Sequence, residues 1–170
     1  KFLPEVLYTS ISEADLVITT ERQTAEKLYV PDYKWFENKN AAEQGYIIKG
    51  FSDGRILIYA ENRMGIMYAL STLIQIPEIE HCFEIKDYPD FRYRGNKWLL
   101  WAETEIWSYD FGDGKKAYIE RIIRKLDLCL KYKINMVLFD ALGFDSERFP
   151  GYAKLMTLLC KEARKRGVYL

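Results

Sequence analysis

The second half of the chain alternates between short apolar segments and long amphipathic ones. Residues 93–101 and 136–139 are apolar and aromatic, which predicts β-strands, whereas residues 115–133 and 150–166 carry apolar side chains at helical spacing. Residues 168–170 predict the beginning of a third strand. This alternation predicts a parallel sheet, because parallel strands are joined by helical crossovers. Both an open doubly wound sheet and a barrel fit the pattern.

Aromatic residues accumulate where the first of these strands ends. Trp98, Trp101, Trp107 and Tyr109 lie there, and no glycine-rich phosphate loop is present. The missing loop argues against a nucleotide-binding fold. The aromatic residues favour a barrel whose mouth faces a sugar, since sites in such barrels form at the carboxyl ends of the strands. The alternative is that the aromatic side chains fill the core.

The first half of the chain predicts a separate α/β unit. The predicted strands are residues 15–20, 45–50, 55–60 and 83–86, and the predicted helices are residues 21–29 and 63–76. The sequence Ser-Asp-Gly at residues 52–54 predicts a tight turn, and therefore a hairpin between the two middle strands. Residues 31–44 are polar and aromatic and predict a loop.

The second predicted helix of this half has recognisable ends and an apolar face. Asn62 can cap its beginning, and Pro77 marks its end. The residues expected to form its buried face are Met64, Met67, Tyr68, Leu70, Leu73 and Ile74.

A break between the two halves occurs at residues 87–90, where Asp-Tyr-Pro-Asp interrupts the pattern. We therefore expect two domains, residues 1–88 and residues 89–170. The predicted class is α/β: an α+β N-terminal domain is followed by the first β/α units of an incomplete (β/α)8 barrel. Two strands and the start of a third cannot close a barrel of about eight. We expect the apolar faces of residues 93–101 and 136–139 to be uncovered, which predicts self-association of this chain or a longer polypeptide.

Composition excludes several classes of partner. The 25 basic and 25 acidic residues give a net charge of zero, which does not favour nucleic-acid binding. No apolar stretch is long enough to span a bilayer. The chain has one histidine, and the spacing of its three cysteines matches no zinc or redox motif. We expect neither a metal nor another cofactor, and we expect Cys129 and Cys160 to be buried in helices.

Five segments of the chain have an order and spacing found in a known family. They are residues 14–18, 44–48, 62–75, 85–95 and 132–135. Together they resemble the N-terminal α/β domain and the barrel entry of glycoside hydrolase family 20, the β-N-acetylhexosaminidases. A glycine, a small-residue face and a final Thr-Leu-x-Gln, as in residues 62–75, are typical of that family's long helix. The same two-part opening occurs in glycoside hydrolase family 84 and in the α-glucuronidases.

The resemblance implies that the chain is the N-terminal portion of a glycosidase acting on glycans, including N-acetylhexosamine-containing ones. In family 20 the substrate's N-acetyl group assists a retaining hydrolysis. The catalytic Asp-Glu pair of that family lies on the fourth barrel strand, whereas this sequence reaches the third. No catalytic residue is therefore assigned, and we expect this segment alone to be inactive. Because family members are often exported, the resemblance also points to a periplasmic or secreted protein.

Two departures from the family pattern leave an alternative open. Leu99 and Ala102 stand where family 20 has an aspartate and a sugar-gripping arginine, and no histidine ends the strand Val137-Leu138-Phe139-Asp140. A non-catalytic carbohydrate-binding or scaffold protein of the same architecture fits these losses, as does a different enzyme built on a β/α series.

Three residues near the strand ends are candidates for substrate binding. Trp101 can stack on a sugar face, while Glu103 and Asp140 can accept hydrogen bonds from ring hydroxyls. The alternatives are that Trp101 packs in the core and that Glu103 is a solvated loop charge. We expect Arg94 to position its strand by pairing with backbone or with an acidic neighbour.

Overall fold

The computed structural model describes residues 14–77, 82–99, 113–140 and 152–170. The chain divides into two compact units, residues 1–90 and residues 91–170, called here the first and the second unit. Each contains helices and strands, so the chain belongs to the predicted α/β class. Among the described residues, no helix combines the length and apolarity that crossing a bilayer requires.

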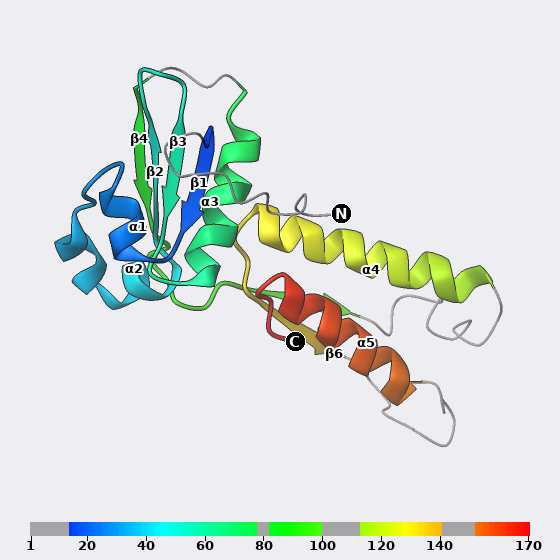
Figure 1. Cartoon of the computed structure of the whole chain (residues 1–170). Coiled ribbons are helices and arrows are strands. Elements are labelled where there is room, and N and C mark those ends of the chain that lie inside the picture. Colours follow the sequence, from blue (N-terminus) through cyan, green and yellow to red (C-terminus); the bar gives the residue numbers. More distant parts are fainter. Residues whose placement is uncertain (1–13, 78–81, 100–112, 141–151) are drawn as a thin grey trace. The chain divides into compact units, whose positions relative to one another are not determined.

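The first unit is built on a four-stranded sheet (Figure 1). Its strands are β1 (Leu16–Thr19), β2 (Tyr46–Gly50), β3 (Ile56–Tyr59) and β4 (Glu84–Asp87), in the spatial order β1-β3-β2-β4. The pairing of β2 with β3 is antiparallel and confirms the predicted hairpin. Strand β1 runs parallel to β3, and β4 pairs antiparallel with β2.

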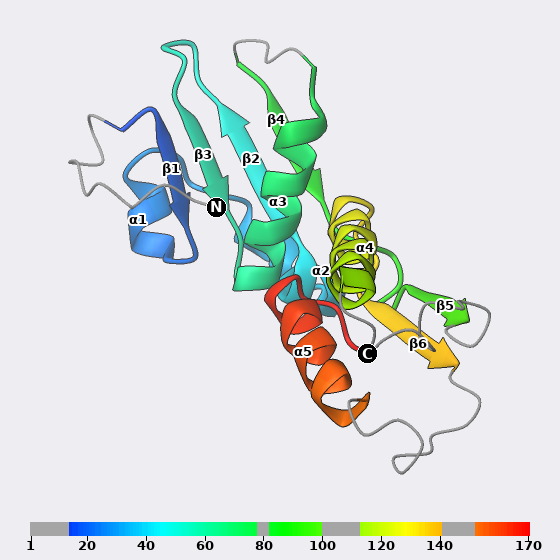
Figure 2. The same cartoon turned by 90° about the vertical axis from the view of Figure 1, so that its right-hand side faces the viewer.

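Helices cover both faces of this sheet (Figure 2). Helices α1 (Arg22–Glu26) and α2 (Lys39–Gln44) and the 3-10 helix η1 (Tyr33–Glu37) lie on one side, and α3 (Arg63–Gln75) lies on the other. The prediction of a loop over residues 31–44 is therefore wrong, because η1 and α2 lie there. The Asn38 side chain caps α2, since its Oδ1 accepts hydrogen bonds from the backbone N–H groups of Asn40 at 2.9 Å and Ala41 at 3.3 Å.

Helix α3 begins at the predicted cap and buries Tyr68 as expected, but the rest of its packing face differs from the prediction. Asn62 Oδ1 accepts a hydrogen bond from the Met64 backbone N–H at 2.8 Å. The buried residues of the helix are Gly65, Tyr68, Ala69 and Ser71. Ile74, which was expected to be buried, is 79% exposed. The physical reason is a close approach of backbones that only small residues permit: a Cβ atom on Gly65 would lie 2.1 Å from the Gly45 carbonyl oxygen.

The second unit has the predicted β/α order. It comprises β5 (Gly95–Leu99), α4 (Asp113–Lys131), β6 (Met136–Asp140) and α5 (Tyr152–Lys165). Strands β5 and β6 pair in parallel, as a helical crossover requires. Tyr169 forms a parallel bridge with Met136, so the third predicted strand begins beside β6.

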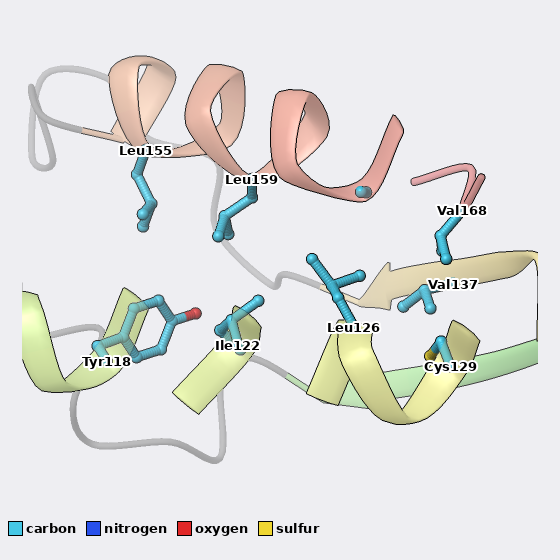
Figure 3. Close-up of a cluster of buried hydrophobic side chains, with 9 residues drawn as sticks. Tyr118, Ile122, Leu126, Cys129, Val137, Leu155, Leu159 and Val168 are labelled. Atoms are coloured by element: carbon cyan, nitrogen blue, oxygen red, sulfur yellow. The ribbon is translucent and has the colours of Figure 1, made fainter. Parts of the chain in front are cut away.

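The core of the second unit lies between the two helices and β6 (Figure 3). Its buried members are Tyr118, Ile122, Leu126, Cys129, Val137, Leu155, Leu159, Ala163 and Val168. Cys129 is a buried thiol, as expected, and burial raises its pKa. Cys160 is only partly buried. The helical spacing of these residues in the sequence thus identified most of the face on which each helix packs.

Gly167 ends α5 in a backbone conformation that favours glycine. Its φ angle is 68°, in the left-handed region where a Cβ atom is strained. We expect Gly167→Ala to lower the free energy of unfolding of the second unit by about 1 kcal/mol. Urea denaturation followed by circular dichroism measures this loss. The exposed Lys161→Ala is the control and is expected to change stability by less than about 0.5 kcal/mol; equal effects of the two variants would contradict the prediction.

Candidate functional site

The carboxyl ends of β5 and β6 lie side by side and form the candidate site. Leu99, the last residue of β5, pairs with Asp140, the last residue of β6. Asp140 therefore lies at a strand end, where barrel sites form. Trp101 and Glu103 lie outside the described residues, so of the three predicted site residues the structure places the backbone of Asp140.

One face of the β5–β6 pair is covered by the helices of the second unit. Trp98 and Phe139 are paired in the register and their rings meet edge to face, with centroids 5.4 Å apart. Both pack against the buried core of the unit. The Lys125 ammonium lies 5.4 Å from the centroid of the Trp98 ring. Trp98 therefore packs toward the helices and does not belong to the aromatic mouth that its sequence position suggested.

The other face of the pair carries residues that are exposed. Side chains alternate along a strand, so the neighbours of Trp98 and Phe139 belong to this opposite face. Leu138 is 60% exposed and Met136 is 41% exposed. Lys97 pairs with Leu138 in the register and is also exposed. The sequence analysis did not single out Lys97, although a charged residue in the middle of a strand is a signal for an open face.

The buried side-chain amide of Asn135 joins the amino ends of the two strands. Asn135 is 4% exposed. Its Oδ1 accepts a hydrogen bond from the Arg94 backbone N–H at 2.8 Å, and its Nδ2 donates to the Arg92 carbonyl oxygen at 2.7 Å. Its own backbone carbonyl accepts from the Tyr169 N–H at 2.8 Å. Asn135 thus connects the segment before β5 with the start of β6 and with the third strand.

Arg94 performs the positioning role that the sequence predicted. Its Nε donates to the Lys133 carbonyl oxygen at 2.6 Å, and one terminal nitrogen donates to the Phe91 carbonyl oxygen. Both acceptors are backbone groups, so the guanidinium fixes the chain where it enters β5. The strand register, and with it the position of Asp140, rests on this network.

An ion-pair network joins α4 to the end of α5. Arg166 Nε lies 2.6 Å from Asp127 Oδ1, and its Nη1 lies 3.0 Å from Glu162 Oε2. Hydrogen bonds from Lys165 and Arg166 hold the pKa of Glu162 below its usual value, although desolvation opposes them. Arg166 therefore ties the two helices together, a more specific role than the favourable dipole interaction its position at the helix end suggests.

This network predicts an acid-sensitive second unit. A carboxylate whose pKa is lower in the folded state contributes stability above its ordinary pKa of 4.5, and this contribution is lost as the pH falls through the folded value. We expect the melting temperature of the second unit to fall below about pH 4.5 and Glu162→Gln to make that fall shallower. Differential scanning calorimetry between pH 3 and 7 measures the melting temperature. Glu120→Gln is the control, because Glu120 is exposed. The same acid profile in wild type and Glu162→Gln would refute the assignment.

The first unit contains a second charged cluster on the sheet face that α1 covers. The Tyr29 hydroxyl donates to Glu84 Oε2 at 2.7 Å, and Lys49 Nζ lies 3.4 Å from the same oxygen. The hydrogen bond from Tyr29 is the main reason that the pKa of Glu84 is lowered. Burial, and then the bond to Glu84, raises the pKa of Tyr29 to about 12. The cluster links the chain after α1 to the sheet and satisfies its charges internally.

The described residues do not assemble a metal site. Within residues 14–77, 82–99, 113–140 and 152–170, no three histidine, cysteine, aspartate or glutamate side chains gather closely enough to hold a metal ion.

No protein-family model matches the chain, and no curated protein is similar to it in sequence. Solved structures do match. One is a GH138 enzyme targeting pectin rhamnogalacturonan II, with a TM-score of 0.58 and 19% identity over 91% of this chain and 24% of that protein. Another is the GH20 exo-β-N-acetylglucosaminidase from Vibrio harveyi, with a TM-score of 0.54 and 18% identity over 90% of this chain and 31% of that enzyme.

The fold is glycoside hydrolase-like. Both matches cover the two units together, so the likeness includes the α/β unit and the β/α series after it. At identities of 19% and 18%, the likeness shows the fold alone. The chain spans 24% of the length of the first of these enzymes and 31% of the length of the second.

Proposed function

We propose that the chain is the N-terminal portion of a glycoside hydrolase that acts on glycans, with N-acetylhexosamine-containing glycans as its substrates. In this proposal residues 1–88 form the N-terminal α/β domain of the family 20 type. Residues 89–170 form the start of a (β/α)8 catalytic barrel whose catalytic pair lies outside this chain. The second unit then supplies part of the barrel's mouth.

The observation that carries the proposal is the order of the two units. A four-stranded sheet covered on both faces is followed by a parallel β/α series, and two glycoside hydrolases share this arrangement over 90% or more of the chain. Parallel strands with helices on one face favour a barrel. The series β5, α4, β6 and α5, with the bridge at Tyr169, then corresponds to its first two β/α units and the beginning of its third strand.

The same placement assigns a role to the residues at the strand ends. Asp140 would accept hydrogen bonds from glycan hydroxyls, since it ends β6 beside the last residue of β5. Glu103 would act in the same way, and Trp101 would stack on the apolar face of a sugar ring. These residues bind the glycan in the proposal, whereas bond cleavage depends on other parts of the protein.

A second candidate function is a non-catalytic carbohydrate-binding or scaffold protein. The observation that favours it is chemical: Leu99 pairs with Asp140 at the candidate site, and an aliphatic residue at this position provides no acid, base or hydrogen bond. The family-20 pattern has an aspartate there. Loss of that group is compatible with binding a glycan without cleaving it.

An assay on the native polypeptide that carries this sequence distinguishes the two functions. It would be incubated with a panel of aryl glycosides that includes β-N-acetylglucosaminides, and glycan binding would be measured by isothermal titration calorimetry. Release of the aryl group is the expected result. Binding without release would support the non-catalytic function, and neither binding nor release would contradict both. Asp140→Ala is expected to weaken glycan binding at least tenfold, with the exposed Asp53→Ala of the first unit as its matched control.

The exposed face of β6 predicts association of the 170-residue chain when it is produced alone. A parallel sheet is normally covered on both faces, whereas Leu138 is 60% exposed. We expect sedimentation velocity to show dimers or larger species at about 100 μM that Leu138→Lys shifts toward monomer. Leu128→Lys is the matched control, because Leu128 is 53% exposed but lies on α4. A monomeric wild-type chain would contradict the prediction.

A further inference from the structure

The segment that joins the two units, residues 88–94, is hydrogen-bonded on both sides of the division between them. The division falls between Asp90 and Phe91. Hydrogen bonds hold Asp90 to the first unit, and they hold Phe91 and Arg92 to the second. The connection therefore differs from a flexible linker, which makes few contacts with the domains that it joins.

The first-unit side of the junction is fixed as far as the Asp90 carbonyl group. The ring of Tyr88 packs edge to face against Trp35, with centroids 5.3 Å apart, and is partly buried against the core of that unit. Pro89 has a φ angle fixed by its own ring, and it confines Tyr88 to extended backbone. The Asn40 side chain then donates a hydrogen bond from Nδ2 to the Asp90 carbonyl oxygen at 2.9 Å. Because a peptide group is planar, this bond also fixes the orientation of the next backbone nitrogen.

The second-unit side of the junction is fixed from the Phe91 carbonyl group onward. One terminal nitrogen of Arg94 donates to the Phe91 carbonyl oxygen. The Asn135 side chain donates to the Arg92 carbonyl oxygen at 2.7 Å and accepts from the Arg94 N–H at 2.8 Å. The Arg94 guanidinium is itself anchored, because its Nε donates to the Lys133 carbonyl oxygen at 2.6 Å. The peptide group that follows Phe91 therefore moves with the second unit.

Between these two fixed peptide groups lies one α-carbon, that of Phe91. Because the peptide groups on either side are planar, only the φ and ψ angles of Phe91 can change without breaking any of these hydrogen bonds. The Phe91 side chain is 73% exposed, so packing of its ring does little to restrict the two angles. The restriction comes instead from the Cβ atom, which limits φ and ψ to a few allowed regions.

We propose that Phe91 is a single-residue hinge between the two units. Asn40 clamps the peptide group on one side of it, and Arg94 clamps the peptide group on the other. The units reorient by rotation about the Phe91 backbone while both clamps stay intact. The hinge is independent of the proposed function, because it follows from hydrogen bonds made within each unit.

The test measures the distribution of distances between the units in the native polypeptide that carries this sequence. Spin labels on non-natural residues at the exposed positions Gln23 and Lys161 mark the first and the second unit, and double electron–electron resonance gives the width of the distribution. Phe91→Gly is expected to broaden it about twofold, because glycine also adopts positive φ angles. Phe91→Ala is the matched control: it removes the same exposed ring but keeps a Cβ atom, so it is expected to retain the native width.

Asn40→Ala tests the clamp on the first-unit side. It releases the peptide group before Phe91, so the backbone of Asp90 gains freedom and the distribution is expected to broaden. Lys39→Ala, at the neighbouring exposed position of α2, is its control and should match the native width.

The outcomes separate the hinge from its clamp. An unchanged width in Phe91→Gly would overturn the hinge, whatever the result for Asn40→Ala. Equal broadening in Phe91→Gly and Phe91→Ala would also overturn it, because the ring would then be the restraint. Broadening in Phe91→Gly with no effect of Asn40→Ala would support the hinge and refute the clamp by Asn40.

Discussion

Gly65→Ala is expected to lower the free energy of unfolding of the first unit by about 3 kcal/mol. In an exposed helix this substitution would stabilise by up to about 1 kcal/mol, because alanine has the higher helix propensity. At this site the new Cβ atom would lie 2.1 Å from the Gly45 carbonyl oxygen and 2.6 Å from the Ala60 Cβ atom. A backbone carbonyl cannot rotate away as a side chain can, so helix α3 must move off the sheet. The steric cost therefore exceeds the gain in propensity.

Urea denaturation of the chain, followed by hydrogen exchange at the backbone amides of the first unit, measures this effect. Ile74→Ala on the same helix is the control, because Ile74 is 79% exposed and its truncation is expected to cost less than about 0.5 kcal/mol. If Gly65→Ala proved as stable as wild type, the close packing of α3 against residues 45 and 60 would be wrong. The contrast is informative because a hydrophobicity pattern alone ranks Ile74 as the more important residue.

The same two residues show what a sequence pattern can and cannot predict. The pattern identified α3, its Asn62 cap and its end, because caps and helix breakers act on residues next to them. It identified Tyr68 on the packing face but not Gly65, because the close approach at Gly65 depends on Gly45 and Ala60, which lie elsewhere in the sequence. Hydrophobic periodicity shows where bulky side chains lie on a helix. It does not reveal a close backbone contact that is possible only because a residue has no side chain.

The other elements were predicted or missed for similar reasons, according to whether a local sequence signal defines them. The hairpin of β2 and β3 was predictable because Ser-Asp-Gly at residues 52–54 defines its turn locally. Helix α2 was missed because its six residues are too few for a periodic signal, and its main local sign is the cap at Asn38. In the second unit, the 19-residue α4 and 14-residue α5 are long enough for their apolar faces to be evident, and both helices were found.

The candidate site was predictable to the level of the strand end and no further. The order of strands and helices identifies Asp140 as a residue that ends a parallel strand, and the structure pairs it with Leu99. Which residues face it depends on register, and register is set by contacts such as those of Asn135 and Arg94 at the opposite end of the strands. For this reason the place of Lys97 opposite Leu138 emerges only once the pairing of β5 with β6 is known.

Asn135→Ala is expected to destabilise the second unit by about 2 kcal/mol, because it removes the two part-buried hydrogen bonds that the side-chain amide makes with backbone groups. The Arg94 N–H loses its acceptor at 2.8 Å and the Arg92 carbonyl loses its donor at 2.7 Å, at a residue that is only 4% exposed. A larger aliphatic residue would fill the space but could not replace either bond. Urea denaturation combined with hydrogen exchange at the Arg94 amide measures the loss.

The effect of Asn135→Ala should also reach the far end of the strands. The amide fixes where β5 begins relative to β6, and a slip of one residue would move Lys97 to the face that now packs on the helices. Asn96→Ala is the matched control, because Asn96 is an exposed asparagine on β5 and its loss should cost less than about 0.5 kcal/mol. Similar stability and similar exchange at Arg94 in the two variants would contradict the role of Asn135. A selective loss in Asn135→Ala would show that the amino ends of the strands determine which side chains share a face at their carboxyl ends.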